Sequence, residues 1–235
     1  RQLYRRNDYY RSPNCVLMFT SPFPDFISFY CGQNPPKQDL RLLPEEQAIA
    51  ESFSSQKRRA EFTLGRICAH GALSRFGLES EPILRNPETR EPCWPDSVWG
   101  SITHSAGFAA VAVGLKKDIK GVGIDMESLS RSVDFNIRRH VCVDSELEWL
   151  ESLPTKQANR ALRIIFSAKE SIFKCLYPST KTYLTFKDAA VTVNKTENSF
   201  SFTIFKSCPG IIQQGFHHHG QYSEMDKMLL TSVYI

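Results

Sequence analysis

The sequence lacks the features that mark membrane-spanning and disulfide-stabilised proteins. No apolar run approaches the ~18 residues of a membrane span, and the first residues are basic and polar, without the apolar core of a signal peptide. The seven cysteines are scattered, form no C-x-x-C pair and are odd in number, which favours reduced thiols over a disulfide framework or a zinc site. We therefore expect a cytoplasmic protein without a membrane segment.

A nucleic-acid-binding pattern and a short-period repeat are also missing. The net charge of +4 and the pI near 8.7 describe a mildly basic surface, which suits an anionic ligand or an acidic protein partner. The basic residues neither form a long run nor alternate with aromatic residues, so we expect no nucleic-acid partner. With 235 residues, the chain can form one large domain or two small ones around a core of useful size.

An amphipathic helix is predicted between Leu162 and Leu176, where apolar residues recur at spacings near three and four. In such a helix Glu170 and Lys174 lie one turn apart on the same face, and Lys169 lies about 100° to one side. The simplest interpretation is a solvated ion pair that stabilises the helix by about 0.2–0.5 kcal/mol.

A second acidic motif, at residues 121–127, changes that interpretation. It predicts a short buried strand in which Asp125 and Glu127 point to the same side, because alternate side chains share a face. Two neighbouring carboxylates repel each other unless a cation or a hydrogen-bond donor lies between them. With Glu170 as a third oxygen ligand, the set suits Mg²⁺, and Mn²⁺ is the alternative ion. This hypothesis requires the three carboxylates to meet around one ion.

These motifs resemble the signature of the 4′-phosphopantetheinyl transferases of the surfactin- and siderophore-synthetase type. In that family a GID-x-E segment precedes F-S/C-A-K-E-x-x-x-K, and the two motifs stand here at residues 123–127 and 166–174. Two further segments agree with the family, residues 57–62 followed by Arg66 and residues 91–105. Any one of these motifs alone would be a weak signal, but four in order are specific.

The resemblance implies an α+β fold of two similar subdomains with the ligand cleft between them. Residues 1–118 would form the N-terminal subdomain with the coenzyme A phosphate contacts, and residues 119–235 the C-terminal subdomain with the metal site and catalytic helix. The two would form one pseudo-two-fold unit, which we expect to be a monomer. Periodicity alone supports only the α+β class.

A group of arginines is the candidate site for the 3′-phosphate of coenzyme A. On a helix Arg58 and Arg66 are roughly 80° apart, so their long side chains can converge on one anion, although a solvated basic face is the alternative. Arg59 is only about 20° from Arg66. The resemblance implies Arg58 and Arg66, with Arg85 as a further contact. Arg90 stands at the glycine of the family's Gly-Lys-Pro segment, which leaves the contact from this loop open.

The remaining coenzyme A contacts come from the resemblance. The pyrophosphate would lie near His104, whose alternative role is a structural hydrogen bond, and the pantetheine arm near Tyr183. The full set of expected coenzyme A contacts is Arg58, Arg66, Arg85, Thr103, His104, Lys169, Lys174 and Tyr183.

In the implied reaction, a serine of an apo acyl- or peptidyl-carrier protein attacks the β-phosphorus of coenzyme A, and 3′,5′-ADP leaves. The expected catalytic residues are Glu170, Lys174 and His104, and the base is either Glu170 or a metal-bound water.

The basic residues Arg131, Arg138 and Arg139 form either a docking surface for an acidic carrier or ordinary surface charge. Two alternatives are a metal-dependent pyrophosphate hydrolase and an inactive module that binds carrier proteins.

Other elements are predicted from local patterns. Pro44 and the acidic residues after it predict a helix start, and the helix continues, with an interruption, to near Gly77. Asp144 is expected to cap a helix over 143–153. Three consecutive histidines at 217–219, flanked by glycines, predict a loop without a metal. Strands are expected at 26–30, 101–105, 108–115, 183–186, 189–193, 200–205 and 228–235.

Overall fold

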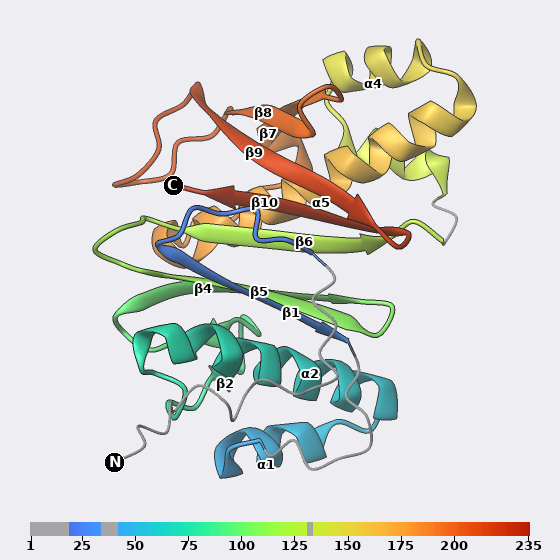
Figure 1. Cartoon of the computed structure of the whole chain (residues 1–235). Helices are drawn as coiled ribbons and strands as arrows, with labels where there is room; N and C mark the ends of the chain where they lie inside the picture. The colour runs from blue at the N-terminus through green and yellow to red at the C-terminus, as the bar shows by residue number, and fades with distance from the viewer. Residues whose placement is uncertain (1–18, 34–41, 131–133) are drawn as a thin grey trace. The chain divides into compact units, whose positions relative to one another are not determined.

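The computed structural model of the chain describes residues 19–33, 42–130 and 134–235. Arg131 of the predicted basic stretch lies outside these ranges. The chain divides into two units between Leu115 and Lys116, and each unit contains helices together with an antiparallel sheet (Figure 1). This arrangement confirms the predicted α+β class. The described cysteines form no disulfide with one another, and no helix in the described ranges is long and apolar enough to cross a membrane.

The helices of the first unit follow the predicted pattern, including the interruption. Helix α1 (Pro44–Ser52) begins at a proline, whose fixed φ suits the first helical position. Phe53 is extended, and Ser55 then starts α2 (Gln56–Leu73) by accepting a hydrogen bond from the Arg58 N–H. The 3₁₀ turn η2 (Ser74–Phe76) follows, and Gly77 ends the helical segment with a φ of +71°.

A three-stranded sheet in the order β1-β5-β4 supports α2 in this unit. Its strands are β1 (Ile27–Gln33), β4 (Val98–Ser105) and β5 (Phe108–Leu115). Ala106 and Gly107 connect β4 and β5 with φ angles of +51° and +85°, the signs that a two-residue hairpin turn requires. The segment that contains Arg85 and Arg90 also forms a small ladder that was not predicted, between β2 (Leu84–Arg85) and β3 (Pro92–Cys93).

The second unit contains a five-stranded antiparallel sheet in the order β6-β10-β9-β8-β7. Helix α5 (Thr155–Thr180) packs on β6 and β10 of this sheet, as the amphipathic pattern predicted. The strands are β6 (Val122–Ser128), β7 (Ala189–Asn194), β8 (Ser199–Ile204), β9 (Phe216–Met225) and β10 (Met228–Tyr234). The connections hold η3 (Phe135–Ile137), α3 (Arg138–Val141), α4 (Asp144–Glu151) and η4 (Phe186–Asp188).

Glycines bring α5 unusually close to β6. A Cβ on Gly123 would collide with the Ser171 carbonyl oxygen and lie 2.6 Å from the Cys175 nitrogen. A Cβ on Gly121 would collide with the Cys175 carbonyl oxygen. Only residues without a side chain permit this approach, which places the acidic strand β6 directly beside the Lys-Glu segment of α5.

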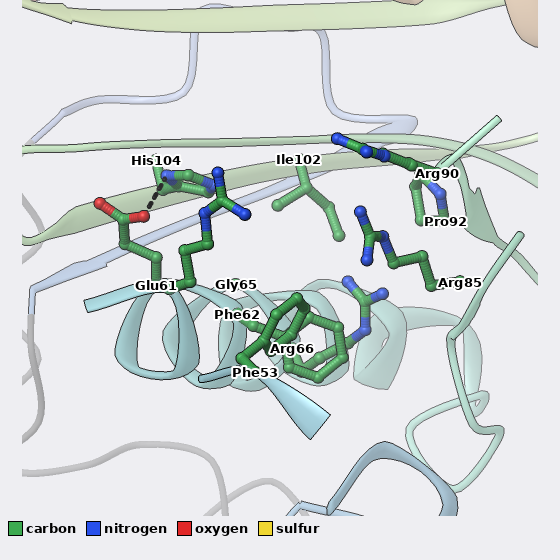
Figure 2. A pocket seen from close by; sticks show the side chains of 11 residues that line it. Phe53, Glu61, Phe62, Gly65, Arg66, Arg85, Arg90, Pro92, Ile102 and His104 are labelled. Atoms are coloured by element: carbon green, nitrogen blue, oxygen red, sulfur yellow. Dashed lines mark ion pairs between the residues drawn. The ribbon is translucent and has the colours of Figure 1, made fainter. Parts of the chain in front are cut away.

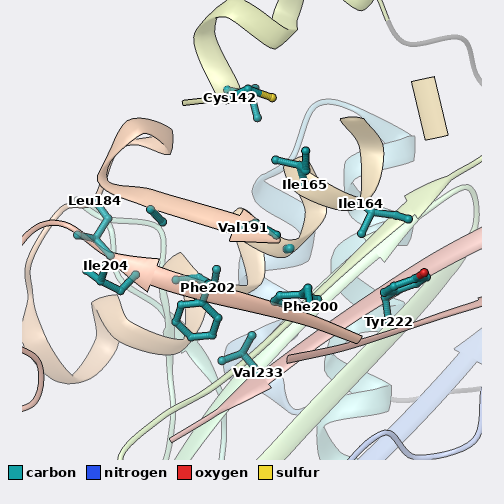
Figure 3. Close-up of a cluster of buried hydrophobic side chains, with 14 of the residues drawn as sticks. Cys142, Ile164, Ile165, Leu184, Val191, Phe200, Phe202, Ile204, Tyr222 and Val233 are labelled. Atoms are coloured by element: carbon teal, nitrogen blue, oxygen red, sulfur yellow. The ribbon is translucent and has the colours of Figure 1, made fainter. Parts of the chain in front are cut away.

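The core of the second unit lies between α5 and the sheet (Figure 3). Phe200 and Phe202 of β8 are fully buried there, together with Ile165 of α5 and Val191 of β7. Alternation along β8 sends these two aromatic side chains to the same face, as expected for a half-buried strand. The core therefore holds the helix that carries the second motif in a defined position on the sheet.

Three local predictions are wrong. Residues 183–186 form no strand, because the chain leaves α5 at Lys181 in a left-handed conformation and enters the turn η4. Residues 217–219 belong to β9 and form no loop. Asp144 is the first residue of α4 and not its cap, since the Glu146 carboxylate accepts from the Val143 N–H at 2.7 Å.

Candidate functional site

A cavity of about 370 Å³ in the first unit gathers most of the predicted arginines (Figure 2). The guanidinium groups of Arg66, Arg85 and Arg90 lie toward one end of the cavity, and His104 and Glu61 lie at the other. The lining residues are Phe53, Arg58, Glu61, Phe62, Gly65, Arg66, Arg85, Arg90, Pro92, Ile102 and His104. Four arginines against one carboxylate give the lining of this cavity a net positive charge, which suits an anion.

Arg66 forms the buried floor of this cavity. Its Nε donates to the Ile83 carbonyl oxygen at 2.8 Å, and its guanidinium carbon lies 4.3 Å from the centre of the Phe62 ring. Burial lowers the pKa of Arg66 to about 10, and the negative charge of Glu46 opposes this shift. Arg66 therefore keeps its positive charge at neutral pH.

Glu46 is the counter-charge beneath Arg66. It is fully buried, accepts from the Ile83 N–H at 2.9 Å, and lies 2.9 Å from His70 Nε2 and 4.0 Å from Arg66 Nε. Burial acts to raise the pKa of Glu46, but the hydrogen bonds with His70 and Ile83 outweigh it and the pKa is lowered. The pattern of the sequence did not indicate this network, since Glu46 resembles any acidic residue in a first helical turn.

The other arginines differ in how they meet the cavity. Arg58 and Arg85 both line it, and the Arg85 guanidinium lies 5.6 Å from the centre of the Phe53 ring. Arg90 also lines it, with a φ of +66° that is uncommon for a residue with a side chain. Arg59 is used elsewhere, because its Nη2 donates to the Phe53 carbonyl oxygen at 3.2 Å.

The side chains of His104 and Thr103 point to opposite faces of the sheet, because they are neighbours on strand β4. His104 lines the cavity, and its Nδ1 lies 3.7 Å from a Glu61 carboxylate oxygen. Thr103 is buried and does not line the cavity, since neighbouring residues of a strand point to opposite faces. The expectation that Thr103 joins His104 in one ligand contact is therefore not met in this cavity.

In the second unit, Asp125 of β6 is held by two donors from α5. Lys174 Nζ donates to Asp125 Oδ1 at 2.7 Å, and Ser167 Oγ donates to Oδ2 at 2.9 Å. Ser167 and Ser171 in turn lie 2.9 and 2.6 Å from the hydroxyl oxygen of Thr231 on β10. The ion pair of Lys174 is thus with Asp125 across the helix–strand contact, and the pair with Glu170 that was the simplest interpretation of the helix is not formed.

The negative charge of Asp125 acts on the pKa of both Glu127 and Glu170. Burial raises the pKa of Glu127 to about 7, and the negative charges of Asp125 and Glu170 act in the same direction. Burial also raises the pKa of Glu170, while Lys174 opposes this shift and Asp125 adds to it. In both glutamates, repulsion from a neighbouring carboxylate adds to the effect of burial, and a bound cation would offset this repulsion.

The three carboxylates do not form the predicted ion-binding cluster as they stand. Within residues 19–33, 42–130 and 134–235, no three His, Cys, Asp or Glu side chains meet closely enough to hold a metal ion. Lys174 is bonded to Asp125 Oδ1 and acts as its counter-charge. The donors have the chemistry that Mg²⁺ prefers, and an ion bound through Asp125 Oδ1 would take the place of Lys174.

Lys169 is also placed differently from the prediction. Its Nζ donates to Glu146 Oε2 at 2.7 Å and to the carbonyl oxygens of Val141 and Phe186, each at 2.8 Å. An ammonium group has three hydrogens, and all three are used inside the protein. With 3% of the residue exposed, Lys169 is an internal anchor between α5, α3 and η4 and has no hydrogen left for a phosphate.

A second cavity, of about 230 Å³, lies beside Glu170 in this unit. Tyr183 forms part of its wall, is 66% exposed and contacts the Phe173 ring edge-on with centres 5.5 Å apart. The lining residues are His140, Lys169, Glu170, Ile172, Phe173, Tyr183, Leu184, Thr185, Phe186 and Ala189. This cavity offers an apolar wall next to a carboxylate with a raised pKa.

The first unit thus contains an arginine-lined cavity, and the second contains a set of carboxylates with a neighbouring cavity that has an apolar wall. Residues 44–114 match the 4′-phosphopantetheinyl transferase N-terminal domain, and residues 121–223 match the 4′-phosphopantetheinyl transferase superfamily. The chain belongs to the 4′-phosphopantetheinyl transferase superfamily and is an enzyme of this class, which transfers phosphopantetheine from coenzyme A to carrier proteins.

Similar proteins support this assignment along most of the chain. The chain is 34% identical over 212 residues to 4′-phosphopantetheinyl transferase Svp of Streptomyces mobaraensis, a match that covers 88% of this chain and 84% of that one. It is 38% identical over 179 residues to 4′-phosphopantetheinyl transferase PptT of Mycobacterium tuberculosis, which covers 72% of each. Enterobactin synthase component D of Salmonella typhi is 30% identical over 138 residues, with 59% and 56% covered.

Proposed function

We propose that this enzyme transfers 4′-phosphopantetheine to a serine of an apo acyl- or peptidyl-carrier protein in a Mg²⁺-dependent reaction that releases 3′,5′-ADP. The observation that carries the proposal is the convergence of four arginines on one cavity of the first unit. Coenzyme A is a phosphate-rich substrate, and planar guanidinium groups bind phosphate oxygens in pairs.

Arg58, Arg66 and Arg85 bind the 3′-phosphate in this proposal. Arg66 supports it best, because Phe62 and the Ile83 carbonyl oxygen fix its guanidinium group. Arg90 is added to the set, since it lines the same cavity. His104 stands at the far end of the cavity, where it is proposed to contact the pyrophosphate.

Asp125, Glu127 and Glu170 are the proposed ligands of Mg²⁺, or of Mn²⁺ as the alternative ion. When bound, the ion would neutralise negative charge on the pyrophosphate. The negative charges of Asp125 and Glu170, which add to the burial that raises the pKa of Glu127, support this assignment, because a cation would offset the repulsion. In this scheme Lys174 exchanges its bond with Asp125 for one with a phosphate oxygen, so that no carboxylate loses its counter-charge.

The reaction needs a proton acceptor and an in-line displacement. The serine oxygen attacks the β-phosphorus, the bond from that phosphorus to the oxygen of the 3′,5′-ADP moiety breaks, and the serine proton passes to Glu170 directly or through a water that the ion would hold. Burial raises the pKa of Glu170 in the metal-free protein, and a bound ion would oppose this shift, so both routes remain in the proposal. Lys174 and His104 stabilise the charge that gathers on the departing phosphate. The cavity beside Glu170, with Tyr183 and Phe173 in its wall, is proposed to hold the pantetheine arm.

Carrier docking is proposed for the basic residues that follow β6. Arg139 is exposed on α3, and the Arg138 guanidinium lies 4.4 Å from the centre of the Phe135 ring. Exposed guanidinium groups attract an acidic partner and raise its association rate. The monomeric state and the cytoplasmic location stay predictions from the sequence.

Intact-protein mass spectrometry of several apo carrier proteins tests the proposal. With coenzyme A and Mg²⁺ present, a carrier should gain the mass of one phosphopantetheine group, and 3′,5′-ADP should appear in equal amount. Glu170→Gln and Asp125→Asn should abolish the gain, whereas Glu148→Gln, at an exposed position on α4, should not. Cleavage of coenzyme A without any carrier would indicate a hydrolase, and carrier binding without transfer would indicate an inactive docking module.

A further inference from the structure

Strand β9 contains three consecutive histidines whose side chains alternate between the two faces of the sheet. In the register with β8, His217 lies opposite Thr203 and His219 lies opposite Ser201. His217 and His219 are exposed and share one face. His218 points to the other face, where its ring contacts Phe202 edge-on and its Nε2 lies 2.9 Å from the Tyr234 carbonyl oxygen.

The two exposed imidazoles have the spacing of ligands that share one ion. Their ring centres are 5.1 Å apart and their planes are nearly perpendicular, at 89°. Two imidazoles bound to one ion with nitrogen–metal distances of about 2.1 Å, at a roughly tetrahedral angle, have ring centres about 5 Å apart. The strand therefore supplies the separation without a change of backbone.

A second observation concerns the orientation of the His217 ring. Its Nδ1 lies 3.2 Å from the Thr203 hydroxyl oxygen on the neighbouring strand. A metal-binding histidine usually uses its second ring nitrogen for such a hydrogen bond, which fixes the ring and the tautomer. When Nδ1 donates its proton to Thr203, Nε2 carries the lone pair and is the nitrogen available to an ion.

We propose that His217 and His219 form a chelating site for a borderline divalent transition-metal ion such as Zn²⁺, Ni²⁺ or Cu²⁺. Imidazole nitrogen suits these ions, whereas Mg²⁺ prefers carboxylate oxygen, so the site differs in chemistry from the proposed Mg²⁺ ligands. The described residues offer no third His, Cys, Asp or Glu close enough to complete the site. Water fills the remaining positions, and the bound ion stays accessible to exchange.

Calorimetric titration of the full, untagged chain with Ni²⁺ tests this site, with excess Mg²⁺ present to occupy carboxylate sites. His218 provides a matched control, because it has the same chemistry on the same strand and faces the other way. His217→Ala and His219→Ala should each weaken Ni²⁺ binding by about a hundredfold, since each leaves one ligand of a linked pair. His218→Ala should bind Ni²⁺ as the unsubstituted chain does.

Two results would overturn the site. One is equal weakening in all three single variants, which would mean that the histidines bind independently. The other is unchanged binding in both His217→Ala and His219→Ala, which would place the ion elsewhere. Thermal unfolding of each variant checks that the sheet is intact. A further variant, Thr203→Val, removes only the hydrogen bond to His217, so it should weaken Ni²⁺ binding without removing a ligand.

Discussion

Replacing Glu127 by glutamine should stabilise the metal-free enzyme at neutral and higher pH while it removes a proposed Mg²⁺ ligand. The pKa of Glu127 is about 7 in the folded protein, against an ordinary value of 4.5. Because the folded-state pKa is raised, the unfolded chain releases this proton first as the pH rises. The free energy of unfolding should therefore fall between about pH 4.5 and pH 7, and above pH 7 the whole destabilisation by Glu127 is present.

The magnitude follows from the same two values. Each pKa unit corresponds to about 1.4 kcal/mol, so a rise of the Glu127 pKa from 4.5 to about 7 corresponds to at most about 3.5 kcal/mol of stability. Glu127 is only partly buried, and solvent screening reduces this value, so we expect about 1–3 kcal/mol. Glutamine has nearly the same shape and no charge, so Glu127→Gln removes the repulsion from Asp125 and Glu170 without opening a cavity.

Urea unfolding in the presence of a chelator, at pH 5 and pH 8, measures the effect. The unsubstituted enzyme should lose stability between the two values, and Glu127→Gln should lose less. Addition of Mg²⁺ at pH 8 should stabilise the unsubstituted enzyme and leave the variant unchanged, since only the former keeps all three ligands. Glu148→Gln serves as the control at an exposed position. Equal or lower stability of Glu127→Gln at pH 8 without metal would refute the electrostatic reasoning.

Three further predictions concern the other parts of the site. Lys169→Met leaves the buried Glu146 carboxylate without its cation, so urea unfolding should show a loss of about 3–5 kcal/mol, and unchanged stability would mean that Lys169 is no anchor. Gly123→Ala forces a Cβ against the α5 backbone and should cost about 3 kcal/mol or more in the same assay; a fully stable variant would contradict the close packing. Arg85→Ala should raise the KM for coenzyme A about tenfold to a hundredfold, whereas Arg59→Ala, whose guanidinium group donates to a backbone carbonyl, should change it little.

The elements that could be predicted are those in which local chemistry and packing agree. Helix α5 has a continuous apolar stripe, and the Pro44 start of α1 depends only on the residues beside it. Strand β9 escaped prediction because three consecutive histidines and Gly220 fill most of its first half and hide the alternation of apolar and polar residues. Its pairing with β8 and β10, which no local pattern expresses, makes it a strand.

For the candidate site, the elements that carry the residues could be predicted, whereas the directions of their side chains could not. The motif places Lys169, Glu170 and Lys174 on one helix, but the partners of each come from elements distant in sequence. Lys169 meets Glu146 of α4, and Lys174 meets Asp125 of β6. Lys169 and Lys174 are five residues apart and therefore about 140° apart around the helix, which suffices to send one lysine into the interior and leave the other beside the carboxylates.

The position of Lys174 explains how a crowded acidic site can exist before any ion binds. The negative charge of Asp125 acts to raise the pKa of Glu127 and of Glu170, and Lys174, which bonds to Asp125, opposes both shifts. An ammonium group on a flexible stem can hold this place and leave it without disturbing the backbone. If an ion takes Asp125, the released Lys174 is a positive charge without a partner. A phosphate oxygen is the natural partner for that charge, so binding of the ion and of the substrate phosphate should favour each other.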